Sequence, residues 1–192
     1  MPILVTAFGP FDGREENASA LALRELKRTF PGIRTRILPV DSVIAPMRLK
    51  RALRILRPSA LIMLGEGAGI RQIQLETTAW NELDFRIPDL AGRQPTGRLI
   101  VSGAPAQRRA TLPMRRLLNR LTANGHEAIL SHQPGRYLCN QVFYTALHFL
   151  ADSAIHCPAG FIHLPLASDY PVDRSVAALN QVLAGVQASA CS

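Results

Sequence analysis

One cysteine stands where a thiol can become a nucleophile. Cys139 follows Gly135 at the start of an apolar segment, residues 137–150, that predicts a central helix. The first turn of a helix offers unpaired backbone amides and the positive end of the helix dipole, which stabilise a thiolate over a thiol. The same amides can hold the oxyanion of a tetrahedral intermediate. The position of Cys139 therefore indicates acyl transfer by a cysteine nucleophile; burial as a small apolar side chain is the alternative interpretation.

The other two cysteines carry no such signal. Cys157 lies in a predicted loop and Cys191 near the end of the chain, each without a candidate base nearby in sequence. No CxxC spacing suggests zinc, and three thiols cannot all pair within one chain. We therefore expect free thiols in a reducing cytosol, and no bound metal.

A nucleophilic cysteine needs a base, and the chain offers five histidines. Only His163 lies near the end of a predicted strand, residues 160–165, where an α/β sheet presents side chains to helix N-termini. The others fall at element edges, within a helix or in a loop: His126, His132, His148 and His156. A carboxylate should orient the base. Spacing alone leaves five candidates open: Glu66, Glu76, Asp84, Asp89 and Asp169.

Strand and helix patterns alternate along the whole chain. The predicted strands are residues 2–8, 33–40, 60–64, 72–80, 128–130 and 160–165. The predicted helices are residues 17–30, 42–57, 114–124, 137–150 and 176–186. Residues 65–69 form a glycine-rich loop, and residues 84–102, rich in Pro, Gly and Arg, favour a long, mobile loop. This alternation predicts an α/β fold, a single-domain three-layer α/β/α sandwich with a largely parallel central sheet.

Composition excludes several classes of protein. The 192 residues carry a formal charge of +8, and all but two of the 22 basic residues are arginine. These arginines are scattered over predicted helix faces without a nucleic-acid-binding motif, so we expect no nucleic-acid partner. No stretch approaches the roughly 20 apolar residues that span a bilayer. The N-terminus lacks a secretory signal pattern, so we expect a cytoplasmic protein that does not bind membranes.

Ordered blocks along the chain resemble those of the pyroglutamyl peptidase I (pyrrolidone-carboxylate peptidase) family. The opening V-T-A-F-G-P-F-D-G is similar to the family's V-T-G-F-x-P-F-G-G, and a later R-I-P-D matches directly. The similar blocks are residues 5–13, 17–19, 73–81, 86–89, 102–105, 111–113, 135–140 and 160–165. Because the blocks keep their order from the first strand to the last helix, the resemblance implies one domain of this type over residues 1–192.

The resemblance implies a function and roles for individual residues. It implies a cysteine peptidase that cleaves the amide bond after an N-terminal pyroglutamyl residue of peptides, through a thioester and without a cofactor. Cys139 would be the nucleophile, His163 the base and Glu76 the third member, with Arg86 near the oxyanion. The implied walls of the substrate pocket are Phe8, Phe11, Glu66, Tyr137 and Leu138. The family also suggests a homo-oligomer, a dimer or tetramer.

Some residues depart from the family pattern. Glu66 stands where many relatives carry glutamine, which raises the hypothesis that it lowers activity or admits a cationic N-terminus. The remaining departures are Ala7, Asp12, Ala18 and Leu90. Two further hypotheses stay open: a cysteine amidase of altered specificity for another small N-acyl or lactam group, and a catalytically silent binding homologue. For Phe8 and Phe11, plain core packing is the alternative to a substrate wall.

Overall fold

The computed structural model describes residues 1–190. Its strands are β1 (Ile3–Phe8), β2 (Arg34–Leu38), β3 (Ala60–Gly67), β4 (Ile73–Glu76), β5 (Thr78–Trp80), β6 (Gln107–Arg109), β7 (Ala128–Ser131) and β8 (Ala159–Pro165). Its helices are α1 (Ala18–Thr29), α2 (Ile44–Leu56), α3 (Met114–Ala123), α4 (Leu138–Ala151) and α5 (Val172–Ala190). No helix among these residues is long and apolar enough to cross a membrane.

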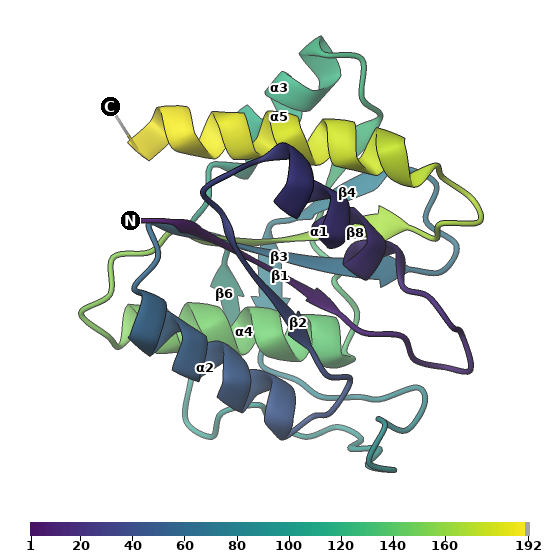
Figure 1. Ribbon diagram of the computed structural model, residues 1–192. Coiled ribbons are helices and arrows are strands. Elements are labelled where there is room, and N and C mark those ends of the chain that lie inside the picture. Colours follow the sequence, from purple (N-terminus) through teal and green to yellow (C-terminus); the bar gives the residue numbers. More distant parts are fainter. Residues whose placement is uncertain (191–192) are drawn as a thin grey trace.

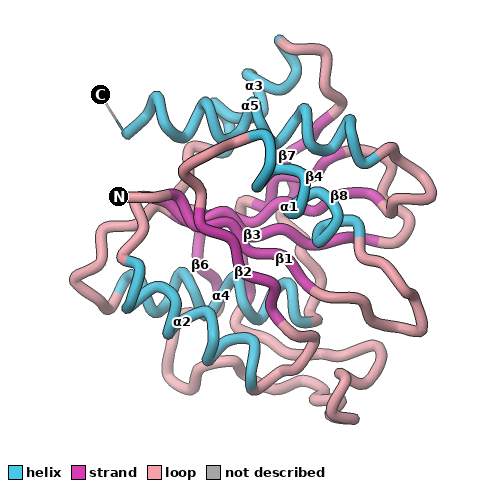
Figure 2. The backbone as a smooth tube through the Cα atoms, in the orientation of Figure 1, coloured by secondary structure: helices cyan, strands magenta, loops and turns pink. Residues whose placement is uncertain are grey.

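Six strands form one central sheet in the order β2-β1-β3-β8-β4-β7 (Figure 2). Every neighbouring pair is parallel except β4 and β8, which run antiparallel. The carboxyl ends of β1, β3 and β8 therefore meet at one edge, which is where α/β proteins place their ligands. The predicted largely parallel sheet is confirmed.

Helices cover both faces of this sheet. Figure 1 shows α1, α3 and α5 on one face and α2 and α4 on the other. Alternate residues of β1 serve the two layers: Ile3 and Val5 join one buried cluster, whereas Leu4 and Phe8 join the other. Alternation of this kind is expected because successive strand side chains point to opposite faces. The predicted three-layer sandwich is confirmed.

The single strand predicted for residues 72–80 is wrong. The structure divides it at Thr77: β4 stays in the central sheet, whereas β5 pairs with β6 in a separate two-stranded ribbon. The backbone of Thr77 turns outward, donating to the carbonyl of Ser131 and accepting from the amide of Ala110. Strand β6 was missed because its Gln-Arg-Arg sequence has no apolar alternation.

The boundaries of the glycine-rich loop were also predicted wrongly. Strand β3 continues to Gly67 because Gly65 and Glu66 are still paired, with His163 and Leu164 of β8. This extension carries β3 as far as the level of His163. It therefore places Glu66 on the rigid sheet and not on a loop.

The long loop predicted at residues 84–102 has no helix or strand, and it carries hydrogen bonds of its own. The carboxylate of Asp89 accepts from the amide and hydroxyl of Ser42 at 2.8 and 2.6 Å. It also accepts from the amides of Ala91 and Arg93. Because Ser42 lies two residues before the first residue of α2, these bonds tie the loop that carries Arg86 to the helical layer.

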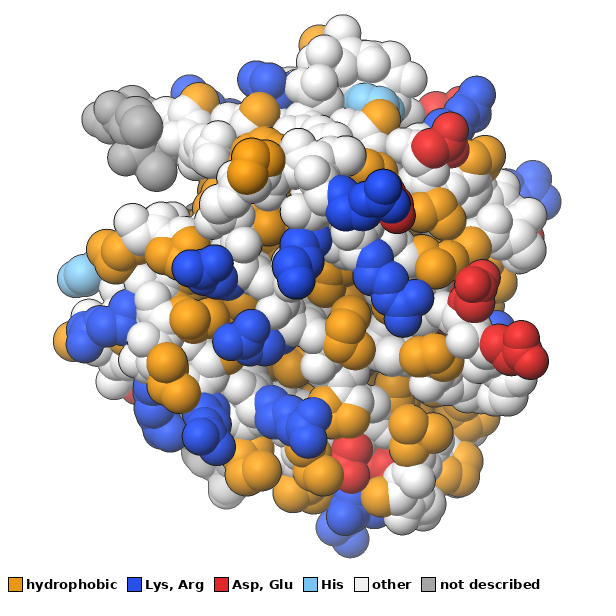
Figure 3. Space-filling model, in the orientation of Figure 1, with side chains coloured by type: hydrophobic (Ala, Val, Ile, Leu, Met, Phe, Trp, Pro, Cys, Tyr) orange, Lys and Arg blue, Asp and Glu red, His pale blue; other side chains and the backbone are white. Residues whose placement is uncertain are grey.

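Basic side chains are dispersed over the surface. On the face in Figure 3, lysines and arginines stand apart from one another, with apolar atoms between them. On α2, for example, Arg48, Arg51 and Arg54 are exposed. This distribution agrees with solvated helix faces and gives no focused basic groove on the face shown.

Candidate active site

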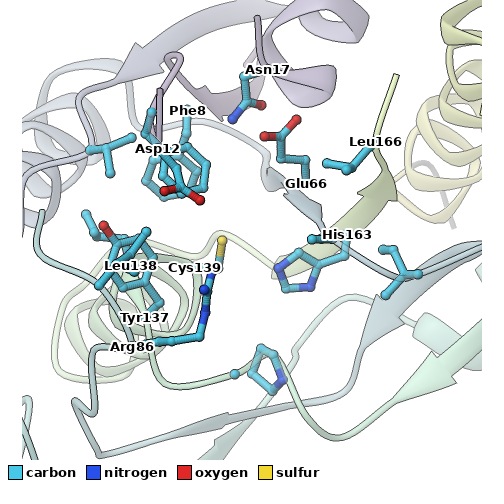
Figure 4. Close-up of a pocket in the computed structure, with 18 of the residues that line it drawn as sticks. Phe8, Asp12, Asn17, Glu66, Arg86, Tyr137, Leu138, Cys139, His163 and Leu166 are labelled. Carbon is cyan, nitrogen blue, oxygen red and sulfur yellow. The ribbon is translucent and has the colours of Figure 1, made fainter. Parts of the chain in front are cut away.

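A cavity of about 530 Å³ opens at the carboxyl edge of the sheet. Cys139 of α4, His163 of β8 and Glu66 of β3 all line it. Figure 4 shows the sulfur of Cys139 beside the ring of His163. Segments that are far apart in sequence therefore meet where the topology predicts a ligand site.

Cys139 lies in the first turn of α4, half-buried and with a free thiol. The first amide of the helix to find a backbone acceptor is that of Gln141, which donates to Tyr137 at 3.1 Å. The amides of Leu138, Cys139 and Asn140 come before it, so they belong to the orphan donors of a helix start. These donors and the helix dipole make the surroundings of Cys139 electropositive.

The first turn of α4 is anchored by the side chain of Asn140, which is fully buried. Its Oδ1 accepts from the amide of Trp80 at 2.8 Å, and its Nδ2 donates to the carbonyls of Trp80 and Glu82 at 2.8 and 2.9 Å. Three hydrogen bonds to the β5 segment therefore fix the residue that follows Cys139.

His163 and Glu76 meet through the one antiparallel pairing in the sheet. His163 is opposite Gln74 and Glu76 is opposite Phe161, so the two are diagonal neighbours on one face. Nδ1 of His163 lies 2.9 Å from Oε1 of Glu76. The Glu76 side chain is wholly buried and the His163 side chain is 9% exposed, so solvent screens this contact very little.

The charge on His163 is strongly favoured. Burial alone would lower its pKa, but a negative Cys139, a hydrogen bond with Cys139 and the contact with Glu76 outweigh it and raise the pKa to about 10. The ring therefore lies between a sulfur and a carboxylate, and each of them stabilises the imidazolium form. A cysteine sulfur beside an imidazolium is an arrangement that can supply the nucleophile and the proton donor of acyl transfer.

The predicted pocket walls line the same cavity. Phe8, Phe11, Tyr137 and Leu138 are all among its lining residues, and Arg86 is too. The rings of Phe11 and Tyr137 stack with centroids 6.0 Å apart. Phe8 also belongs to the core cluster beneath α2 and α4, so core packing and lining the cavity are both true of it.

The sequence-based prediction did not select two residues that support the cavity walls. Phe85 packs on the ring of Tyr137, with centroids 4.4 Å apart. Arg14 lies over Phe11 and pairs with Glu66. A scattered arginine gives no sequence signal of its own; the one available clue is that Arg14 follows Phe11 by three residues in a turn-rich loop.

Glu66 is already provided with partners. Its Oε2 accepts from the amide of Ala18 at 2.6 Å, and its Oε1 lies 2.8 Å from Nη1 of Arg14. That second contact is an ion pair without hydrogen-bond alignment. Burial raises the pKa of Glu66, while Ala18 and Arg14 oppose the rise. Because the Arg14 guanidinium and the amide of Ala18 already face it, the carboxylate does not offer an unpaired charge to a cationic N-terminus.

The remaining candidates lie elsewhere. Of the five carboxylates, Glu76 is the one bonded to His163; Asp84, Asp89 and Asp169 do not line the cavity. Cys157 is buried, and burial raises the pKa of its thiol to about 12, which leaves it unreactive. Cys191 lies outside the described residues. Within residues 1–190, no cluster of three His, Cys, Asp or Glu side chains is arranged to hold a metal ion.

The protein is a cysteine-type hydrolase. This class is defined by an α/β sandwich that places a thiol at a helix start, a charged imidazole beside the thiol and a buried carboxylate behind the imidazole. Comparisons with known proteins narrow this class. The family model for pyroglutamyl peptidase matches residues 1–191. The chain is 38% identical to a pyrrolidone-carboxylate peptidase of Ralstonia nicotianae, over 96% of this chain and 89% of that one.

Solved structures agree with the sequence matches. A pyrrolidone carboxyl peptidase from Thermococcus litoralis superposes with a TM-score of 0.89 at 32% identity, covering 95% of this chain and 91% of that one. A mutant of the same peptidase from Pyrococcus furiosus gives 0.92 at 29% identity, covering 98% and 99%. The chain belongs to the pyroglutamyl peptidase family.

Proposed function

We propose that the protein hydrolyses the amide bond after an N-terminal pyroglutamyl residue of peptides, with Cys139 as nucleophile, His163 as acid and base, and Glu76 as the group that orients His163. The observation that carries the proposal is the row of sulfur, imidazole and buried carboxylate: Cys139 and His163 line the cavity, and Glu76 lies behind His163. Family membership supports the same activity.

The chemistry is covalent acyl transfer. The Cys139 thiolate attacks the pyroglutamyl carbonyl carbon, so that a carbon–sulfur bond forms and the carbonyl oxygen takes the negative charge. Amides in the first turn of α4, with Arg86 nearby on the cavity wall, stabilise that oxygen. His163 gives its Nε2 proton to the leaving nitrogen, and the carbon–nitrogen bond breaks.

Water completes the cycle. Neutral His163 accepts a proton from a water molecule, whose oxygen attacks the thioester carbonyl. The carbon–sulfur bond breaks, pyroglutamic acid leaves and gives its carboxyl proton to solvent, and the thiolate and imidazolium are restored. Glu76 holds the ring through Nδ1, as the carboxylate does in other triads.

The cavity suits a pyroglutamyl group because that group carries no ammonium. Phe8, Phe11, Tyr137 and Leu138 offer apolar surface for a flat lactam ring. An ordinary charged N-terminus would lose its hydration there, and Glu66, the buried carboxylate of the lining, is already paired with Arg14. The pocket therefore selects for a neutral, cyclic N-terminal residue.

We further infer the cellular setting from the family. The partners are peptides with N-terminal pyroglutamate, the location is the cytoplasm and the protein assembles as a homo-oligomer. Gel filtration with light scattering measures the assembly, and a monomeric mass would refute that part.

The test is hydrolysis of a pyroglutamyl fluorogenic amide by purified protein. We expect turnover that iodoacetamide abolishes and that Cys139→Ala lacks. A panel with glutaminyl, prolyl and acetyl groups in place of pyroglutamyl separates the proposed activity from a cysteine amidase of other specificity. Binding of a pyroglutamyl dipeptide without any turnover would identify a silent binding homologue instead.

A further inference from the structure

A tight turn brings Arg14 over a wall of the cavity. The amide of Arg14 donates to the carbonyl of Phe11 at 3.2 Å, which closes a four-residue β-turn. Both central residues have positive φ, +58° at Asp12 and +70° at Gly13, as in type I′ turns. The guanidinium carbon of Arg14 lies 4.9 Å from the centroid of the Phe11 ring, within the range of a cation–π contact.

Glu66 fixes the other end of this contact to the sheet. Oε1 of Glu66 lies 2.8 Å from Nη1 of Arg14, and its Oε2 accepts from the amide of Ala18 at the start of α1. The Glu66 side chain is 3% exposed and stands on β3, whereas Arg14 is 33% exposed on a loop. The guanidinium therefore links a loop side chain, Phe11, to a buried acceptor on the rigid sheet.

We propose that Arg14 and Glu66 are positioning residues that hold the ring of Phe11 as a wall of the acyl pocket, and so set the affinity for the pyroglutamyl group. This inference rests on the proposed function; it adds Arg14 and gives a positioning role to Glu66, which the family resemblance places in the pocket wall. Within residues 1–190, the hydrogen bonds and ion pairs of Arg14 and Glu66 do not involve Cys139 or His163, so we expect the pair to act on substrate binding and not on the chemical step. Glutamine at position 66 would keep an acceptor for Ala18 and lose the ion pair with Arg14.

The arrangement also makes binding sensitive to acid. Burial raises the pKa of Glu66, so its carboxylate takes up a proton at a higher pH than an exposed glutamate does. Once neutral, it no longer holds Arg14. The other titratable or charged groups that border its two cavities are Asp12, Glu15, Glu16, Arg86, Tyr137, Cys139 and His163. The pyroglutamyl amide substrate has no group that titrates at acidic pH, so a change in KM on acidification reports a change in the enzyme.

The test compares Arg14→Met, Arg14→Lys, Glu66→Gln and the double variant Arg14→Met/Glu66→Gln. The substrate is the fluorogenic pyroglutamyl amide. Calorimetry measures binding of a pyroglutamyl dipeptide to the same variants in a Cys139→Ala background. The matched control is Arg28→Met, which removes an arginine from an exposed ion pair with Glu25.

We expect Arg14→Met to raise KM and the dipeptide Kd about fivefold with kcat within twofold of wild type, the size of a lost cation–π contact. Glu66→Gln should raise both by about threefold, and the double variant should match Arg14→Met alone because the two residues act as one unit. Arg14→Lys keeps the charge and should restore most of the affinity. In wild type KM should rise on acidification, and in Glu66→Gln that rise should be absent.

Unchanged KM and Kd in Arg14→Met and Glu66→Gln would overturn the inference while leaving the proposed function intact. The inference would also be overturned if the rises in KM and Kd of the two single variants multiplied in the double variant, or if kcat fell with KM unchanged. The proposed function fails if wild type does not hydrolyse the amide and the Cys139→Ala variant does not bind the dipeptide. This inference then fails with it.

Discussion

The sulfur of Cys139 lies against the backbone of Gly65. A Cβ built on Gly65 would stand 2.9 Å from Sγ and 2.8 Å from Cζ of Phe161, closer than real Cβ contacts. Gly65 is paired with His163 in the β3–β8 ladder, so the backbone that contacts the sulfur of Cys139 is also the backbone beside His163. Absence of a side chain at residue 65 is therefore what allows thiol and imidazole to lie together.

This contact predicts the effect of Gly65→Ala. The new methyl group must displace the sulfur or the Phe161 ring, and misplacing a reacting atom by about 1 Å can cost about 100-fold in rate. We expect kcat/KM to fall between about 10- and 100-fold while circular dichroism stays unchanged. The control is Gly9→Ala, whose Cβ would meet only Ile37, at an ordinary 3.8 Å. Wild-type activity in Gly65→Ala would show that the sulfur is placed differently.

Glu76→Gln should remove the buried negative charge beside His163. Glu76 and Cys139 raise the pKa of His163 to about 10 despite burial, so removing the carboxylate charge should lower that pKa. We expect kcat to fall by about 100-fold or more, the scale of general acid–base catalysis. Nitrogen NMR of the imidazole measures the pKa, with Glu82→Gln as control because Glu82 pairs with Arg136 near the surface. An unmoved His163 titration would contradict the assignment.

The same raised pKa sets a pH window for stability. The folded value of about 10 lies above the ordinary 6.5, so the protonated ring favours the folded state. Its contribution is complete below pH 6.5 and is lost as the pH rises towards 10. Urea unfolding measures the free energy of unfolding across this pH range. This free energy should fall in wild type as the pH rises, and it should fall less in Glu76→Gln. The same pH dependence in both proteins would refute the linkage.

Asn140→Ala tests how the first turn of α4 is held. The substitution removes three hydrogen bonds and leaves the buried amide of Trp80 without its partner, which should cost about 3 kcal/mol in the free energy of unfolding. Asn140→Asp should be destabilising as well, because an oxygen would then face the carbonyls of Trp80 and Glu82. Urea titration measures both variants, and a cost below about 1 kcal/mol would mean that the anchor is unimportant.

Asp89→Asn tests the tie between the long loop and α2. Burial raises the pKa of Asp89, but hydrogen bonds from Ser42, Arg93 and Ala91 lower it to about 2, from 3.8. This difference stabilises the fold by about 2 kcal/mol above pH 4, and the contribution is lost as the pH falls towards 2. Wild type should lose this stability on acidification and Asp89→Asn should not. The exposed Asp84 on the same loop gives a control, Asp84→Asn, which should behave as wild type.

The sequence predicts the layers of the fold well because local patterns carry them. Apolar runs such as residues 60–64 show strands covered on both faces, and the alternation with helices then determines the sandwich. Cys139 and His163 can be proposed from local signals too, a helix start and a strand end.

Glu76 and Arg14 could not be selected in this way. The Glu76–His163 contact depends on an antiparallel pairing between strands 87 positions apart, and no local pattern records which strands are neighbours. The break at Thr77 is likewise decided by a distant partner, Ser131. Arg14 acquires its role only once β3 brings Glu66 beside it. The pairing of strands in the fold therefore determines these partners, which residue types alone left open. At Glu76, the family resemblance had already selected the residue.

Trapping the acyl-enzyme tests the central claim most directly. Wild type and Cys139→Ala are quenched in acid within the first turnovers of a pyroglutamyl amide, digested and analysed by mass spectrometry. We predict one pyroglutamyl group on the peptide that contains residue 139 in wild type, labile to hydroxylamine, and none in the variant. A pyroglutamyl adduct on another residue, or normal turnover in Cys139→Ala, would contradict the account.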